Sequence, residues 1–283
     1  MKAIVAVLLP AVFIGCGGGS DSPTGPEPAG ATKSPASKPT ALPAKALPKT
    51  VRTIHVFVAL CDNDSQGIVP VSKTLGDGED PGNNLYWGAM YGTKTFLKKT
   101  KAWKTVSIAR RLDPVILERM VLKHRKTGAY LVADAYRGVK IIEAVESFLQ
   151  AAAGRSAAVM EINGAPLGLY GKADLVAYVG HNGLMDFRVT PPDRAATSDA
   201  PRAAIVLACY SKRYFRDTLA SYGCKPILLT TGRMAPEAYT LEGAIEAWLT
   251  GHGPQGMRGR AALAYNKYQK CGIRAATGLF HAE

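Results

Sequence analysis

The 283-residue sequence lacks the short motifs that mark the common cofactor and metal sites. No GxGxxG or Walker-type loop follows an apolar run, and no HExxH motif is present. None of the five cysteines is spaced as CxxC, a spacing that many structural zinc sites use. No internal repeat is visible either. We therefore predict a chain that uses neither a cofactor nor a bound metal.

Large apolar side chains are almost missing from residues 17–50, which are rich in proline, glycine, alanine and serine. Such a segment cannot bury enough surface to offset the entropy lost on ordering. We expect a disordered tether, which its prolines keep extended. The folded part is then residues 51–283, long enough for a single domain with one sizeable core.

Residues 1–16 have the pattern of an export signal. Lys2 precedes the apolar run "AIVAVLLPAVFI", which is too short to cross a bilayer as a permanent helix. The following "FIGCGGGS" resembles the bacterial lipobox, with Phe13 in place of the usual leucine. That resemblance implies that Cys16 is lipidated and becomes the mature N-terminus, anchored by more than one acyl chain. The alternative is an ordinary signal peptide in which Cys16 is incidental.

The net charge of +13 does not by itself indicate a nucleic-acid-binding protein. The lysines are scattered, and no mixed aromatic and basic motif of an RNA-binding type accompanies them. An exported, lipid-anchored protein meets anionic headgroups first. We expect a membrane partner, no nucleic acid, and a location in the cell envelope outside the cytoplasm. Gly17 is not the aspartate of an inner-membrane retention signal, which slightly favours an outer membrane.

Buried strands alternating with amphipathic helices predict the fold. Residues 53–60 and the runs "DLVAYVG", "AAIVLAC" and "PILLTT" are dense in apolar residues, as in strands that are buried on both faces. Residues 139–152 and 236–249 repeat apolar side chains at helical spacing. This order indicates an α/β fold, a three-layer sandwich with a mostly parallel sheet covered by helices on both faces.

Two further segments are less regular. Residues 83–99 have apolar positions at helical spacing, which predicts a helix. Residues 113–128 begin with Asp-Pro and end with glycine, as a helix would, yet their alternation also suits a hairpin. We favour the helix slightly.

Three predicted strands end in polar or reactive residues. These are Cys61, Asp62 and Asn63 after the first strand, His181 in "VAYVGHNG", and Cys209 in "AIVLACYS". Ligands of open α/β sheets bind outside the carboxyl ends of the strands, so these side chains should meet at one edge. His181 and Cys209 at the ends of neighbouring strands could then act together.

Cys209 would need a thiolate to act as a nucleophile. A helix predicted from about Ser211, with Lys212, Arg213 and Arg216 in it, would place positive charge near the sulfur. The alternative is a structural cysteine that simply ends a strand. Another pair, Cys224 and Cys271, could form a disulfide in an oxidising compartment, although spacing cannot fix the pairing.

The two strand ends together resemble the caspase-fold cysteine peptidases, the group that includes caspases, metacaspases, legumains and gingipains. The resemblance lies in "VAYVGHNG", then "AIVLACYS", within the strand and helix order of residues 54–249. It implies that Cys209 is the nucleophile and that His181 protonates the leaving amine. It also implies an oxyanion site formed by backbone N–H groups of Cys209 and of the residues after the histidine, here Asn182 and Gly183. Tyr210 and Ser211 depart from the small residues usual after the cysteine.

The same resemblance implies a pocket for the residue before the cleaved bond, at positions held here by Asp62, Asn63 and Thr231. An acidic Asp62 would favour arginine or lysine there. Alternatively, Asp62 only caps a turn. The sequence therefore predicts a membrane-anchored cysteine endopeptidase that acts on peptides or proteins. The alternative is a non-catalytic envelope lipoprotein, with a degenerate caspase-like or doubly wound domain, that binds peptides or envelope polymers.

Overall fold

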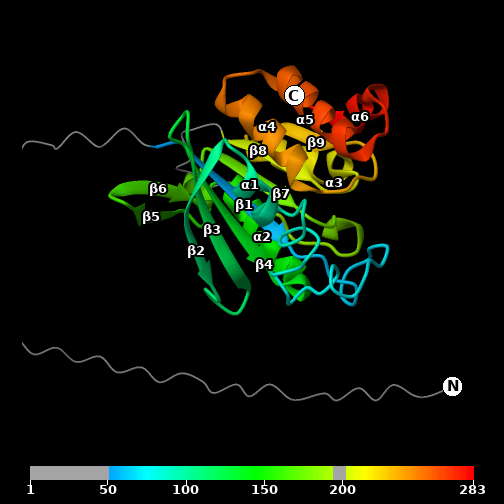
Figure 1. The fold of residues 1–283 in the computed structure, drawn as a ribbon, viewed down its shortest axis with the longest axis horizontal. Helices are drawn as coiled ribbons and strands as arrows, with labels where there is room; N and C mark the ends of the chain where they lie inside the picture. The colour runs from blue at the N-terminus through cyan, green and yellow to red at the C-terminus, as the bar shows by residue number, and fades with distance from the viewer. Residues whose placement is uncertain (1–50, 194–201) are drawn as a thin grey trace, which may run out of the picture. The chain divides into compact units, whose positions relative to one another are not determined.

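An eight-stranded mixed sheet forms the centre of the part of the chain that the computed structural model describes, residues 51–193 and 202–283 (Figure 1). Across the sheet the order is β10-β9-β8-β7-β1-β4-β3-β2. The bounds of these strands are β1 Thr53–Ala59, β2 Trp103–Arg110, β3 Ile116–His124, β4 Tyr130–Tyr136, β7 Leu175–Val179, β8 Ala203–Leu207, β9 Lys225–Thr230 and β10 Phe280–His281.

The five middle strands are parallel and the three added at the edges are antiparallel. β9, β8, β7, β1 and β4 run in one direction, whereas β10 pairs with β9, and β3 and β2 extend the other edge. Every residue of β1, β4 and β7 is buried, because other elements cover both faces of these strands.

Helices form a layer on each face of the sheet (Figure 1). One core joins alternate residues of β1, such as Val56, to α1 (Thr93–Lys99), α4 (Ala238–Leu249), α5 (Pro254–Gln269) and α6 (Ile273–Leu279). The other joins Phe57 and its neighbours to α2 (Ile141–Ala152) and α3 (Ser211–Ser221). The predicted three-layer α/β sandwich with a mostly parallel sheet is confirmed.

A small hairpin and three short 3-10 helices complete the described elements. The hairpin, β5 (Ala158–Ile162) and β6 (Ala165–Leu169), packs on β3 and β4 through a separate apolar cluster. The 3-10 helices are η1 (Gly138–Lys140), η2 (Tyr170–Lys172) and η3 (Gly183–Met185). None of the helices described is long and apolar enough to cross a bilayer.

The helix predicted for residues 113–128 is wrong, because this segment forms strand β3. The carboxylate of Asp113 accepts hydrogen bonds from the backbone N–H groups of Val115 and Ile116, each at 2.7 Å, and so caps a turn. β3 then pairs with strands on both sides, β2 and β4. The backbone hydrogen bonds to these two neighbouring strands stabilise the extended conformation, although a few apolar residues have helical spacing.

The helix predicted for residues 83–99 is shorter than expected, since only α1 is helical and residues 83–92 form turns. The side-chain oxygen of Asn84 accepts hydrogen bonds from the N–H groups of Cys61 and Tyr86. Gly92 approaches the backbone of Trp87 too closely to allow a Cβ. These contacts hold the segment against the end of β1 in a non-helical path.

The predicted export signal at residues 1–16, its Cys16, and the predicted tether at residues 17–50 lie outside the described residues. The described residues belong to one compact unit, Leu47–Glu283. The four cysteines in it are free, with Cys224 buried and Cys271 exposed, so the possible disulfide between these two is not formed.

Candidate active site

β7 and β8 bring His181 and Cys209 to the same edge of the sheet. The last paired residues of these parallel strands are Val179 and Leu207, whose side chains belong to the core beneath α4 and α5. His181 and Cys209 each follow that pair by two residues. The two residues therefore stand at the same level, just beyond the ends of neighbouring strands. Both line one cavity of about 440 Å³.

Gly180 allows β7 to end directly before the histidine. Its φ angle is +148°, and a Cβ there would lie 2.9 Å from the carbonyl oxygen of Ala59 on β1. A larger residue would therefore be strained and would clash with the neighbouring strand. The glycine lets the backbone turn out of the sheet so that His181 reaches the cavity.

The imidazole of His181 is held by a carboxylate that the sequence analysis missed. Its Nε2 lies 2.6 Å from Oδ2 of Asp186, and the side chain is 7 % exposed. The same oxygen accepts the backbone N–H of Gly67 at 3.0 Å. Since a carboxylate only accepts, Nε2 carries the ring proton and Nδ1 of the neutral ring is a free acceptor. This is the orientation that a general base needs.

Cys209 is half-buried, and its sulfur contacts the loop after β9. The backbone N–H of Met234 donates to Sγ at 3.4 Å, and Sγ lies 3.6 Å from the carbonyl oxygen of Met234, within reach of a thiol donor. The thiol and the imidazole of His181 share the cavity without a direct hydrogen bond. Tyr210 then adopts φ +53°, and α3 begins at Ser211. The sulfur therefore lies close before a helix N-terminus.

The predicted oxyanion donors are only partly available. Within the described residues, the backbone N–H groups of Cys209 and Asn182 have no hydrogen-bond acceptor. Asn182 is fully buried, however, and does not line the cavity; its side-chain amide instead donates to the carbonyl oxygen of Cys209 at 2.6 Å. Gly183 donates its N–H to the carbonyl of His181, which removes it as a donor. The N–H of Cys209 is left as the candidate donor to an oxyanion.

Two long loops and α5 form the cavity walls. The loop after β1 contributes an apolar wall with Ile68, Val69, Leu85 and Tyr86. The opposite wall comes from residues 233–237 after β9, and Gln269 of α5 closes one side. An apolar wall, with polar groups beside the sulfur, is the kind of lining that binds a peptide.

The residues predicted to select the substrate lie elsewhere. The carboxylate of Asp62 accepts the N–H groups of Asp64 and Ser65, which is the turn-capping alternative. The side-chain amide of Asn63 makes two hydrogen bonds with the backbone of Val71. Thr231 donates to the carbonyl of Gly278 at 2.8 Å. None of the three predicted residues lines the cavity.

The basic side chains of α3 do not face this cavity either. Lys212, Arg213 and Arg216 line a separate hollow with Tyr210 and Thr231. Arg216 also pairs with Glu283 at 2.5 Å. The positive charge that we expected near the thiol is therefore limited to the start of α3 and the N–H of Met234.

The comparisons with known proteins give no relatives. No protein-family model, no curated protein and no solved structure matches this chain. The site must be interpreted from its own geometry.

The other buried thiols differ from Cys209 in their surroundings. Burial raises the pKa of Cys61 to about 11, and a hydrogen bond to Tyr86 only partly offsets this. Burial raises the pKa of Cys224 to about 12. Neither is accessible, since their exposed fractions are 0 % and 2 %. Cys209 is the described cysteine that combines a cavity with a neighbouring histidine.

Two functional candidates escaped the sequence analysis, Asp186 and Glu237. Asp186 follows His181 by only five residues, so a carboxylate soon after the histidine was a visible signal. The 3-10 helix η3 turns the chain back and creates the contact. Glu237 is the acidic residue in the cavity wall, and its carboxylate accepts hydrogen bonds from Tyr239 and Gln269. No local pattern marks it.

Proposed function

We propose that this protein is a cysteine endopeptidase that uses His181 and Cys209. The observation that carries the proposal is one cavity lined by both side chains, at the ends of two adjacent parallel strands, with the imidazole oriented by Asp186. A nucleophile, a base and a group that orients the base are the parts of a nucleophilic acyl-transfer site.

The first half of the proposed reaction forms a thioester. Nδ1 of His181 takes the proton of the Cys209 thiol, and the thiolate attacks the carbonyl carbon of the peptide bond. The negative charge that develops on the carbonyl oxygen is stabilised by the N–H of Cys209. The imidazolium then gives its proton to the leaving amine as the C–N bond breaks.

The second half releases the acid. Nδ1 of His181 takes a proton from a water molecule, whose oxygen attacks the thioester carbon. The C–S bond breaks and the proton returns to the sulfur, so no co-reactant besides water is needed. Asp186 keeps the imidazole in one tautomer through both halves and is a positioning residue.

Glu237 supports a preference for arginine or lysine in the substrate. It lies in the wall beside Met234, whose backbone contacts the reactive sulfur, and a substrate cation could pair with its carboxylate. We thus still propose that a carboxylate selects basic residues, but the carboxylate is that of Glu237 and not that of Asp62. Arg233 lines the same cavity but is exposed, so solvent screens its charge from a bound cation.

A second candidate is a peptide-binding lipoprotein without catalysis. It is favoured by one observation: the sulfur of Cys209 contacts the backbone of Met234 and not the imidazole. In that case the cavity holds a peptide and the thiol is a structural group. The two candidates differ in whether the thiol reacts in a way that depends on His181.

We also propose that the chain is anchored to a bacterial membrane, outside the cytoplasm, by a lipid on Cys16, with an outer membrane slightly favoured. The support is the sequence of residues 1–17 alone. Labelling of the full chain with a radioactive fatty acid in a bacterial host should be lost in Cys16→Ala and retained in Cys271→Ala. Equal labelling of both variants would contradict the anchor.

The peptidase proposal is tested with a library of peptides and three forms of the full chain. Wild type should cleave, Cys209→Ala should not, and Cys271→Ala should cleave like wild type because Cys271 is exposed and does not line the cavity. Equal turnover by wild type and Cys209→Ala would eliminate the proposal. Absence of cleavage by wild type, together with peptide binding and alkylation of Cys209 that His181→Ala leaves unchanged, would establish the binding candidate.

A further inference from the structure

The sheet has a second charged end, opposite the cavity. Lys101, Lys104, Lys123, Arg125 and Lys126 are all exposed, and we name them the amino-end basic surface. In the antiparallel ladder of β2 and β3, Lys104 is the direct partner of Lys123. The N–H of Arg125 donates to the carbonyl of Ala102 at 2.8 Å, which joins the β3–β4 turn to the segment carrying Lys101.

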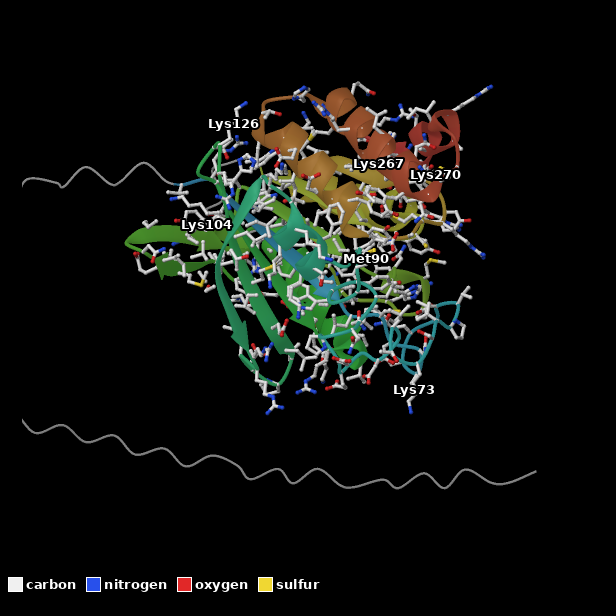
Figure 2. All side chains as sticks on the ribbon, in the orientation of Figure 1. Lys73, Met90, Lys104, Lys126, Lys267 and Lys270 are labelled. Carbon is white, nitrogen blue, oxygen red and sulfur yellow. The ribbon has the colours of Figure 1, made fainter. Side chains whose placement is uncertain are left out.

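Strand register fixes which end of the sheet this is. Lys123 pairs with Tyr130 on β4, and Tyr130 pairs with Thr53, the first residue of β1. One row across the sheet therefore leads from the start of β1 to Lys123 and Lys104. His181 and Cys209 lie beyond the opposite, carboxyl ends of the parallel strands. Figure 2 shows Lys104 and Lys126 on the side where β1 begins, and Lys73, in the loop after β1, on the other side.

The surface lacks the acidic partners that usually balance such lysines. No Asp or Glu occurs between Asp80 and Asp113, or between Glu118 and Asp134. None of the five basic residues forms an ion pair with a described acidic residue. Glu246 of α4 approaches this end of the sheet, but His124 binds its carboxylate at 2.9 Å.

The pairing of Lys104 with Lys123 is costly for the protein alone. Side chains directly opposite in an antiparallel pair have Cβ atoms about 5 Å apart, and like charges there repel each other. Lys123 places its ammonium over the ring of Tyr130, which does not neutralise it. An external anion over both lysines would remove the repulsion. The unbalanced charge therefore indicates an anionic partner.

We propose that the amino-end basic surface docks on the anionic headgroups of a lipid membrane. The chain enters the folded unit at this same end, at Val51 and Arg52. A stretch of 34 residues separates Cys16 from Val51, and such a length can reach about 110 Å when extended. An N-terminal attachment of that length could not orient the domain by itself. The surface charges provide the orientation, with the cavity turned away from the membrane.

Lipid fits this surface better than nucleic acid. Trp103 and Tyr130, the aromatic residues beside the basic side chains, are 3 % exposed and cannot stack on bases, and the guanidinium of Arg52 covers one face of Trp248 at the same end. Basic residues near an anionic membrane each contribute by simple electrostatics, without a shaped pocket. The five side chains, which come from β2, β3 and the loops beside them, offer that kind of contact.

The test compares two triple variants of the full chain that remove the same charge. Lys101, Lys104 and Lys126 are changed to Gln in one, and Lys73, Lys267 and Lys270, which are also exposed, in the other. Partitioning is measured on phosphatidylcholine vesicles and on vesicles that also contain phosphatidylglycerol. The neutral vesicles report the part of the binding that belongs to the apolar N-terminal residues.

At low salt, the ratio of partitioning on anionic vesicles to partitioning on neutral vesicles should be about 100-fold lower for the first triple variant than for wild type. The second should lose much less, and added salt should shrink the difference. Equal losses of affinity for anionic vesicles in both triple variants would overturn the proposal, because binding would then depend on the net charge of the protein and not on one surface. Loss of binding to duplex DNA by the first variant, with vesicle binding unchanged, would identify nucleic acid as the partner and would also overturn it.

A footprint on bound wild-type protein gives a second, independent measurement. Acylation by a water-soluble reagent should be slowed at Lys104 and Lys126 on anionic vesicles relative to neutral ones, and unchanged at Lys267 and Lys270. Equal acylation of Lys104 and Lys126 on both vesicles would contradict the docking. Neither result depends on the chemistry of Cys209.

Discussion

Asp186 offers the sharpest test of the candidate active site, because one of its oxygens has two partners. Oδ2 accepts Nε2–H of His181 at 2.6 Å and the N–H of Gly67 at 3.0 Å. In Asp186→Asn, an amide nitrogen at that position would meet the N–H donor of Gly67. The amide should therefore keep its oxygen toward both partners, and Nε2 of the imidazole should keep its proton.

The expected losses of kcat/KM follow from this orientation of the amide. Asp186→Asn keeps the hydrogen bond and loses only the negative charge, and 36 % exposure of that side chain weakens the charge by solvent screening. A hydrogen bond to a charged group is worth about 1 kcal/mol more than a neutral one, which predicts a fall in kcat/KM of about 5-fold. Asp186→Ala removes the hydrogen bond as well and frees the ring, which predicts a fall of about 100-fold.

The assay is kcat/KM on one peptide substrate for wild type and the two variants, with thermal unfolding as a control for loss of the Gly67 contact. The rate of alkylation of Cys209 should follow the same order, wild type, Asn, Ala, which a purely structural role would not produce. If Asp186→Asn is as damaging as Asp186→Ala, the amide has turned its nitrogen toward His181 and the reasoning from Gly67 fails. If both variants match wild type, Asp186 does not position the base.

Three further predictions concern other groups. Glu237→Gln should lower kcat/KM about 10-fold for substrates with arginine before the cleaved bond and leave an uncharged substrate unchanged; equal effects on both would remove Glu237 from substrate selection. At pH 8, burial should leave about one thiol in a thousand ionised at Cys61, so mass spectrometry should find Cys271 alkylated in the native protein and Cys61 only after unfolding. Burial opposes ionisation of Asp134, but hydrogen bonds from Arg119 and His55 outweigh it and lower the pKa of Asp134. The ionised carboxylate therefore adds to the free energy of unfolding above the unfolded pKa near 4, and this contribution is lost as pH falls through the lower folded pKa. Asp134→Asn should lower the free energy of unfolding by about 3 kcal/mol at pH 7 and should make it less dependent on pH in the acid range. An unchanged dependence on acid pH would contradict the assignment.

The strands of the sheet centre could be predicted because each is a short, continuous apolar run. β7 ends at Val179 and β8 at Leu207, and both are apolar throughout, whereas the sequences of α2 and α4 repeat apolar residues at helical spacing. A fully buried parallel strand leaves this signal in its own sequence. The three-layer architecture follows from the alternation of such strands with helices.

β3 could not be predicted in the same way, because its pattern serves two structures. Its residues Leu117, Met120 and Val121 are buried, a spacing that a helix also gives. Hydrogen-bonded pairing with β2 and β4 stabilises the strand, and this pairing is not visible in the local sequence of β3. The turn cap at Asp113, which looks like a helix start, is compatible with either.

The site residues that directly follow strands could be predicted from the sequence, whereas those that loops bring into the site could not. His181 and Cys209 could be placed on one edge because parallel neighbours end together. Glu237 enters the cavity wall only because α4 and α5 pack against each other and hold Gln269 beside it. Asp62 has the charge expected of a residue that selects basic substrates, but its Oδ1 caps the following turn and the residue does not line the cavity.

The two ends of the sheet allow the two proposals to be tested separately. β1 has seven residues, so about 23 Å separate the amino-end basic surface from the cavity end. This distance is more than two Debye lengths at physiological ionic strength, where the screening length is about 8 Å. Replacing Lys101, Lys104 and Lys126 should therefore leave kcat/KM on a short peptide within about 2-fold of wild type, because their field does not reach the thiol. A larger loss with an unchanged melting temperature would mean that the two ends are coupled through the sheet, and that membrane docking and cleavage are not independent.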